Sequence, residues 1–267
     1  DLFEEVANPR GISLMPARIM GDSFRRTPPC SRWMRFHTQT TGCSLTAQQP
    51  YNNIVRTTTQ ALAAVLGGTQ SLHTNSLDET LALPSEFAAT VALRTQQILA
   101  DETGVANTID PLAGSYFVES LTNQMEENAW EYIERIKEMG GMLAAIDNGF
   151  PQREIAAAAY HYQRQLDSGE KVMVGVNKYV TEENVSAEVL KIGEEVERHQ
   201  LDRLAEVKRS RDSRAALQAI NDLRVASKTD KNLMPYVIEA VKAGVTEQEI
   251  CDVWRDAYGE YRDPGIY

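Results

Sequence analysis

Cysteine and histidine are scarce in this chain, and their spacing excludes two classes of site. The three cysteines, Cys30, Cys43 and Cys251, lie far apart in a sequence of 267 residues. An odd number of widely spaced cysteines forms neither a disulfide framework nor a zinc pattern. We therefore expect reduced thiols in a cytosolic or organelle-matrix protein, and we predict a cytoplasmic location. The four histidines show no metal-ligand spacing, so we assign no metal site.

The chain also has fewer basic than acidic residues, and it has no long apolar run. Lys and Arg number 27 against 38 Asp and Glu, which gives a net charge of −11. Nucleic-acid binding needs clustered Lys and Arg, so we expect no nucleic-acid partner. No apolar run reaches the roughly 18 residues that a transmembrane helix needs. The N-terminus lacks the basic and apolar regions of a secretory signal, and we expect no membrane partner.

Regular secondary structure is predicted from about residue 34 onward. Runs of β-branched and aromatic residues alternate with helical spacing of apolar residues. They predict two strand-then-helix units in the order strand 34–40, helix 51–66, strand 69–74 and helix 85–100. Ser76 and Glu79 form a capping pattern that predicts a further helix from Leu77, which Pro84 ends or kinks. Units of this kind in series predict a parallel sheet or a (β/α) barrel.

The region before residue 34 is predicted to be irregular, and the region after residue 120 is predicted to be mostly helical. Prolines and glycines interrupt residues 1–33, so we expect an irregular segment there with at most one short helix. Residues 108–118 predict a turn-rich third strand region, and residues 171–176 predict a further strand. Helical spacing recurs at 119–137, 143–146, 151–167, 193–209, 212–226, 231–243 and 247–258. We divide the chain into an N-terminal segment (1–33), strand–helix units (34–120) and a helix-rich region (121–267).

Polar side chains line the first predicted strand. Arg35, His37 and Gln39 share one face of it. A strand covered by helices on both sides is normally apolar throughout. Two explanations stay open: a lumen that holds a polar ligand, or buried polar groups that satisfy one another or bind water.

Small polar loops follow both strands. Residues 40–46 have the composition either of a ligand-binding loop or of an ordinary helix cap. Capping explains Ser76 and Glu79 after the second strand, but it does not explain the polar run at 73–75. Cys43 has no evident basic partner in the local sequence, which favours a packed side chain over a nucleophile.

Seven stretches of the chain share the order and spacing of one known family. They are RFHTQTTGCSLT (35–46), YNNIVRT (51–57), GTQSLHTNSLDE (68–79), IDP with GSY (109–116), GGM (140–142), IDNGFP (146–151) and DSG with VGVNKY (167–179). Together they resemble the methylmalonyl-CoA mutase family. The resemblance is closest over residues 34–180 and looser to the end. It identifies the chain as the C-terminal part of a large-subunit barrel domain.

The resemblance implies an α/β fold: the last βα units of a partial (β/α)8 TIM-type barrel, followed by a helix-rich C-terminal region. It implies an acyl-CoA substrate, adenosylcobalamin as cofactor, a cobalamin-binding small subunit or domain as partner, and an oligomer. The implied activity is that of an isomerase, which converts methylmalonyl-CoA to succinyl-CoA by a radical rearrangement. In such a reaction the cofactor carries the hard chemistry.

The resemblance also implies roles for residues at the ends of both strands. Cofactor contact is implied for Gln39, Gly42, Asn75, Glu79, Ala82 and Leu83. His37 and Gln70 are implied to line the substrate.

The family's substrate-contacting tyrosine, histidine and arginine motifs do not occur in this sequence, nor does its Asp-x-His-x-x-Gly cobalt-ligand motif. We therefore assign no catalytic residue and expect the chain alone to be inactive. Two alternatives stay open. One is a sister mutase acting on isobutyryl-, ethylmalonyl- or 2-hydroxyisobutyryl-CoA. The other is a non-catalytic module that binds cobalamin or a partner.

Overall fold

The computed structural model describes residues 1–25, 28–182, 189–262 and 265. The chain divides into two compact units, residues 1–190 and residues 191–266. The boundaries predicted after residues 33 and 120 stay predictions. None of the helices in the described ranges is long and apolar enough to cross a membrane.

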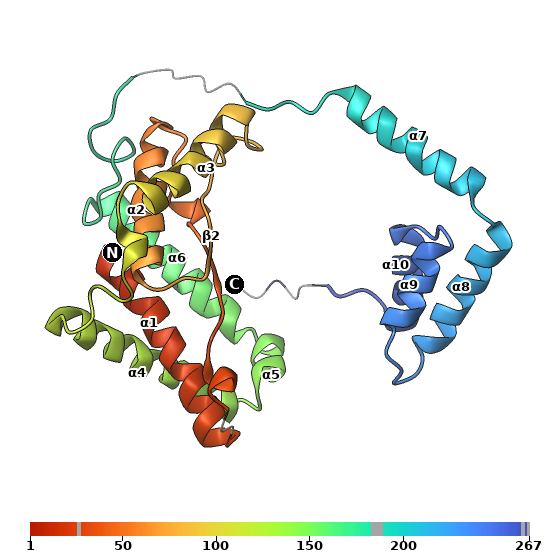
Figure 1. Ribbon diagram of the computed structural model, residues 1–267, viewed down its shortest axis with the longest axis horizontal. Coiled ribbons are helices and arrows are strands. Elements are labelled where there is room, and N and C mark those ends of the chain that lie inside the picture. The colour runs from red at the N-terminus through yellow and green to blue at the C-terminus, as the bar shows by residue number, and fades with distance from the viewer. Residues whose placement is uncertain (26–27, 183–188, 263–264, 266–267) are drawn as a thin grey trace. The chain divides into compact units, whose positions relative to one another are not determined.

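The first unit contains a parallel strand pair with its connecting helix (Figure 1). Strand β1 (His37–Gln39) pairs with β2 (Ser71–His73), and His37 lies opposite Ser71 in the register. Helix α2 (Asn52–Leu66) connects the strands, and α3 (Glu86–Asp101) follows β2. This order confirms the two predicted strand–helix units. The described residues form a mostly helical α/β arrangement with little sheet, and the barrel stays a proposal.

The N-terminal segment is helical, so the expectation of an irregular segment is wrong for most of residues 1–25. Helix α1 (Leu2–Arg18) begins after Asp1, whose Oδ1 accepts a hydrogen bond from Phe3 N at 2.9 Å. A π-helical turn (Ile19–Ser23) follows, and a short 3-10 helix spans Pro29–Arg32. Residues 26–27, which also belong to this expectation, lie outside the described residues.

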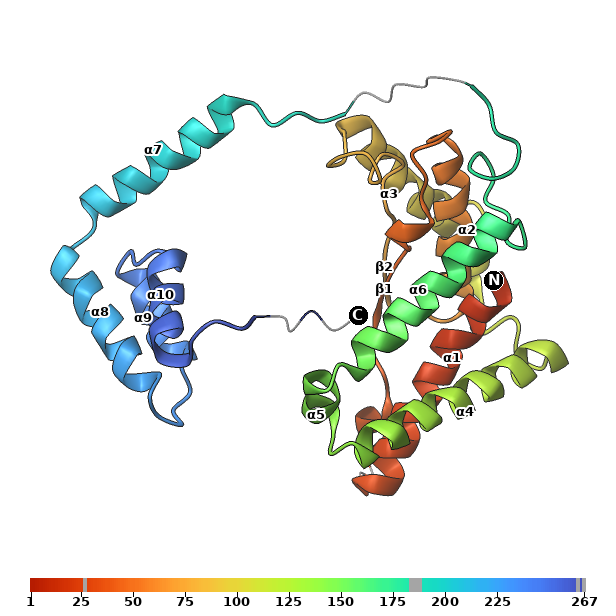
Figure 2. The same ribbon diagram turned by 180° about the vertical axis from the view of Figure 1, so that it is seen from behind.

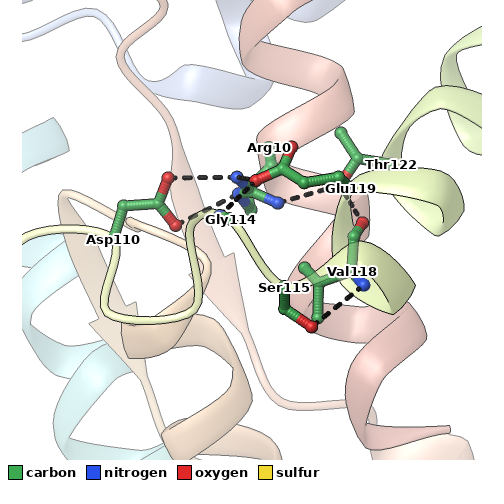
Figure 3. Close-up of polar contacts among 7 residues, drawn as sticks. All are labelled: Arg10, Asp110, Gly114, Ser115, Val118, Glu119 and Thr122. Carbon is green, nitrogen blue, oxygen red and sulfur yellow. Dashed lines mark hydrogen bonds and ion pairs between the residues drawn. The ribbon is translucent and has the colours of Figure 1, made fainter.

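Helix α1 packs beside α4 (Tyr116–Glu138), and both views show the two helices side by side (Figures 1 and 2). Arg10 joins them. Its guanidinium donates to Glu119 Oε1 at 2.7 Å and to Thr122 Oγ1 at 3.2 Å, and it pairs with Asp110 at 3.1 Å (Figure 3). Desolvation acts to lower the pKa of Arg10, but the Glu119 and Asp110 carboxylates outweigh it and raise the pKa. Arg10 in turn, with the Gly114 N–H, lowers the pKa of Glu119.

These contacts explain why the region 108–118 contains the predicted turns, whereas the predicted strand is wrong. Asp110 has a left-handed backbone with φ of 47°, and its side chain faces Arg10. Residues 110–114 form turns, and α4 begins immediately after Ser115, which caps the helix by accepting from Val118 N. The strand predicted at 171–176 is also wrong, because only a single bridge, Val174 to Lys178, forms there. The predicted helices of this region are confirmed as α5 (Met142–Asp147) and α6 (Phe150–Ser168).

The helix predicted from Leu77 is wrong as well, because residues 77–83 form turns and bends. Backbone N–H groups of Leu81 and Ala82 both donate to the carbonyl of Asp78, at 2.8 and 3.1 Å. The carboxylate of Asp78 accepts from Ser85 N at 2.9 Å. The chain is thereby turned directly into α3, which Ser85 caps as predicted.

Asn53 fixes the loop after β1 to the turn after β2. Its side chain is fully buried, at 0% exposure. Oδ1 accepts from Thr46 N at 3.0 Å, while Nδ2 donates to Thr46 O at 2.9 Å and to Leu77 O at 2.8 Å. Arg56 Nη1 also donates to Asn53 Oδ1 at 2.7 Å. One residue of α2 thus holds both segments that leave the sheet.

The second unit is helical and has its own core. Helix α7 (Glu194–Ser210) buries none of its residues, and α8 (Ser213–Ala226), α9 (Met234–Lys242) and α10 (Glu247–Tyr258) pack together. These four helices confirm the predicted ones. The core is Ala216, Leu223, Ala240, Val245, Ile250 and Val253.

An ion pair closes this helical unit. Arg211 donates to both carboxylate oxygens of Glu249 at 2.7 Å, and to Gly244 O at 2.9 Å. Glu249 also completes a capping box with Thr246. The hydrogen bond from Arg211, with those from Thr246, lowers the pKa of Glu249 to about 2.

We expect Glu249→Gln to destabilise the second unit by about 1.5–3 kcal/mol at pH 7, because it removes charge-assisted hydrogen bonds. The carboxylate's contribution is fully present above its ordinary pKa of 4.5 and is lost as the pH falls toward 2, since the folded-state pKa is depressed. Amide hydrogen exchange in α8 and α10 at pH 7 and pH 3 measures both effects. Glu239→Gln, in an exposed pair with Lys242, is the control and should change little. Equal exchange rates in the two variants would contradict the prediction.

We expect Asn53→Ala to lower the free energy of unfolding of the first unit by about 1–3 kcal/mol, because it leaves buried backbone groups at Thr46 and Leu77 without their partner. Chemical denaturation, with hydrogen exchange to locate the change, measures it. Asn52→Ala is the matched control, since that side chain donates to Gln49 at a partly exposed position. If both variants unfold at the same denaturant concentration, Asn53 does not hold these segments.

Candidate functional site

The candidate site lies at the edge where both strands end. Gln39 is the last residue of β1, and Asn75 follows β2 by two residues. Gln39 Nε2 donates to Asn75 Oδ1 at 2.9 Å. Parallel strands bring their carboxyl ends to the same edge, so residues 36 positions apart meet there. The two amides form the base of the site.

Asn75 is held rigidly while one of its donors stays free. It is 2% exposed, and its backbone N–H donates to Thr40 Oγ1 at 2.9 Å. Thr57 Oγ1 donates to its carbonyl at 3.5 Å. The side-chain Nδ2 has no hydrogen-bond partner among the described residues. Buried polar groups are nearly always bonded, so a buried donor of this kind is suited to a ligand's acceptor.

Gly42 and Glu79 border the same amide. A Cβ added to Gly42 would lie 3.5 Å from Asn75 Nδ2 and 3.7 Å from Glu79 Oε1. Glycine at this position therefore leaves the space over the two polar groups open. The structure thus brings four of the six predicted cofactor residues together: Gln39, Gly42, Asn75 and Glu79.

The other two predicted cofactor residues lie on the turn that carries Glu79. Ala82 is half-buried, and Leu83 is 56% exposed. They place apolar surface on the same turn as a carboxylate.

The residues predicted to line the substrate have different surroundings. His37 Nδ1 lies 2.6 Å from Ser71 Oγ, and with Gln39 the residue lines a cavity of about 820 Å³ between α1, β1, α2 and α6. Gln70 accepts from Phe36 N at 2.8 Å and donates to Gly68 O at 2.7 Å. Both amide atoms of Gln70 therefore bond to backbone beside the strands.

The sequence analysis did not predict the structural roles of Asn53 and Asp78. Asp78 is 1% exposed and accepts a hydrogen bond from Ser85 N, whereas the capping pattern of Ser76 and Glu79 predicted a helix at this position. A polar residue at helical spacing between the apolar positions of 51–66 was the available signal for Asn53. Thr74, in the polar run at 73–75, is structural, because its hydroxyl donates to Ala92 O at 2.7 Å.

The arrangement is suited to binding. It offers amide and carboxylate groups with apolar surface beside them, a combination that can hold and orient a large polar ligand. Within the described ranges, no group of three His, Cys, Asp or Glu side chains is placed to hold a metal ion.

Comparison of the sequence with known proteins shows the family of the chain. The model of the methylmalonyl-CoA mutase family matches residues 1–260. Methylmalonyl-CoA mutase of Rhizobium meliloti is 46% identical over 263 residues, which cover 98% of this chain and 37% of the relative. The 2-hydroxyisobutanoyl-CoA mutase large subunit of Aquincola tertiaricarbonis is 44% identical over 270 residues, covering 100% of this chain and 48% of the relative.

A third relative, methylmalonyl-CoA mutase of Escherichia coli, is 42% identical over 265 residues, or 99% of this chain and 37% of the relative. The chain therefore spans between about a third and a half of the length of these relatives. Because the family match and these identities run through nearly the whole sequence, the chain belongs to the methylmalonyl-CoA mutase family.

Proposed function

We propose that this chain is part of an adenosylcobalamin-dependent acyl-CoA mutase, an isomerase that converts methylmalonyl-CoA to succinyl-CoA. One observation carries the proposal: Gln39, Gly42, Asn75 and Glu79 meet at one edge of a parallel strand pair, with a buried amide donor left free. Family membership supports the reaction class.

The strand pair is proposed to be part of a (β/α)8 barrel. The β1–α2–β2–α3 order is the repeating unit of such barrels, and barrel enzymes place their sites on the loops that follow the strands. The candidate site is on those loops. The chain's share of its relatives' length fits the last units of a barrel whose other strands lie in a further segment or chain.

The residues at the edge fit a cofactor that carries many amide groups. When bound, adenosylcobalamin supplies the radical chemistry of the rearrangement. Gln39 and the free Asn75 Nδ2 provide hydrogen bonds for its polar groups, and Glu79 provides an acceptor for a hydroxyl. Gly42 leaves room for close approach, while Ala82 and Leu83 supply apolar contact. His37 and Gln70 are proposed to lie on the substrate side.

Assembly with other polypeptides is part of the same proposal. The name of one relative, a large subunit, supports a separate cobalamin-binding small subunit or domain as partner, within an oligomer. Isolated cysteines support a cytoplasmic location for the assembly.

A sister mutase is the second candidate. The relative that acts on 2-hydroxyisobutanoyl-CoA is 44% identical, against 46% and 42% for two methylmalonyl-CoA mutases. These values separate the substrates poorly, so the substrate must be decided by assay. A non-catalytic cobalamin-binding module is the third reading.

We expect the complete protein, assembled with its cobalamin-binding partner, to convert methylmalonyl-CoA to succinyl-CoA, and residues 1–267 alone to give no turnover. Mass spectrometry of the acyl-CoA products measures both. Exclusive turnover of isobutyryl-, ethylmalonyl- or 2-hydroxyisobutyryl-CoA would identify a sister mutase. Cobalamin binding without turnover of any of these substrates would favour the non-catalytic cobalamin-binding module. Turnover by residues 1–267 alone would contradict the proposal that this chain supplies only part of the active enzyme.

We expect Gly42→Leu to weaken adenosylcobalamin binding by tenfold or more while the protein stays folded, because the added side chain occupies the space over Asn75 and Glu79. Absorbance titration measures the affinity, and thermal unfolding checks the fold. Ala47→Leu adds a similar side chain to an exposed position of the same loop and serves as the control. Unchanged affinity in Gly42→Leu would place the cofactor elsewhere.

A further inference from the structure

Asp78 is a buried acid, and one of its two carboxyl oxygens has no partner among the described residues. Two acidic side chains are buried in the part of the chain that the structure describes, Asp78 and Glu126. Glu126 pairs with Arg18 at 2.7 Å. Asp78 forms no ion pair within the described ranges, and its Oδ1 has no hydrogen-bond partner there. Burying an unpaired carboxylate is costly, so a need for stability alone does not account for it.

The carboxylate of Asp78 accepts one hydrogen bond, which lies at the start of α3. Asp78 Oδ2 accepts from Ser85 N, and Ser85 is the N-cap of α3. The N-terminal end of a helix favours negative charge, which strengthens this contact. The bond joins the two ends of the segment 78–85.

That segment carries the apolar and acidic part of the candidate site. Its backbone is closed around Asp78, because the N–H groups of Leu81 and Ala82 both donate to the Asp78 carbonyl. Asn53 holds the preceding residue through Leu77 O. The segment is no helix, so its shape rests on these few bonds. Removal of the Asp78 carboxylate releases the end of the turn that leads into α3.

We propose that Asp78 is a positioning residue for the cofactor surface: its buried carboxylate fixes the turn from residue 78 to 85, and thereby Glu79, Ala82 and Leu83, against the start of α3. The inference rests on the proposed function and deepens it, because it adds to the proposed cofactor site a residue that positions the other residues of the turn.

Two substitutions of Asp78 in the complete protein distinguish the effect of its hydrogen-bond acceptor from the effect of its side-chain volume. Asp78→Asn keeps an oxygen for Ser85 N, whereas Asp78→Leu has a similar shape and no acceptor. Glu126→Leu removes the other buried acid, far from the turn in sequence, and is the control for a general loss of stability. Adenosylcobalamin affinity by absorbance titration, thermal unfolding, and hydrogen exchange of the Leu81, Ala82 and Ser85 amides are measured for each variant.

We expect Asp78→Leu to weaken adenosylcobalamin binding by roughly ten- to a hundredfold, since small misplacements of binding groups have effects of this size. Asp78→Asn should recover most of the loss, and exchange of the three amides should accelerate in Asp78→Leu alone. Glu126→Leu should unfold at a lower temperature and bind the cofactor as the parent does.

Three outcomes overturn the inference. Unchanged affinity in Asp78→Leu shows that the turn needs no anchor. Equal losses in Asp78→Leu and Glu126→Leu show a general effect of stability, and equal losses in Asp78→Leu and Asp78→Asn show that the bond to Ser85 is not the cause. Failure of the parent protein itself to bind adenosylcobalamin overturns the proposed function, and the inference falls with it.

Discussion

The parallel pairing of β1 with β2 is the constraint on which the candidate site depends. Parallel strands need a crossover, and α2 supplies it, so the ends of both strands reach the same edge. Gln39 and Asn75 meet there only in the observed register. A slip of one residue would turn the Gln39 side chain to the opposite face of the strand and break its bond to Asn75. The contact between the two amides therefore depends on the sheet, and the position of the site follows from it.

Several polar side chains are buried behind this edge beside apolar ones. The buried members there include Thr40, Asn53, Thr57, Thr74 and Asn75. Most of their hydrogen-bonding groups have partners, which makes their burial tolerable. The two exceptions near the edge, among the residues described, are Asn75 Nδ2 and Asp78 Oδ1. Two of the five buried side-chain atoms that lack a partner among the described residues therefore lie where β2 leads into the turn, and the other three are on Gln152, Arg211 and Trp254.

Helices with intact local signals could be predicted from the sequence, and those shaped by distant contacts could not. Helix α3 begins after Ser85 as predicted, because the cap acts within three residues. Helix α1 was missed because Pro9 and Gly11 indicate a break. In the fold, both are contact points: Pro9 lies against Gly67, where a Cβ would come within 2.9 Å of it, and Gly11 faces the backbone of α4 at Thr122. Packing against α2 and α4 outweighs the local preference of these residues.

The same limit applies to the site. The resemblance, together with the polar ends of both strands, was sufficient to predict Gln39, Gly42, Asn75 and Glu79, and the structure brings them together. The residues that hold them in place were hidden. The buried residues of α2 are small or polar: Asn53, Thr57, Ala61, Ala63 and Ala64.

Small side chains on the buried face of α2 allow the helix to lie close to the segments leaving the sheet, and Asn53 then reaches both Thr46 and Leu77. A pattern of hydrophobicity finds bulky apolar residues and passes over small and polar ones. The geometry of this edge is set by residues of the second kind. It follows that the ligand-facing groups of such a site are easier to predict from sequence than the buried polar residues that position them.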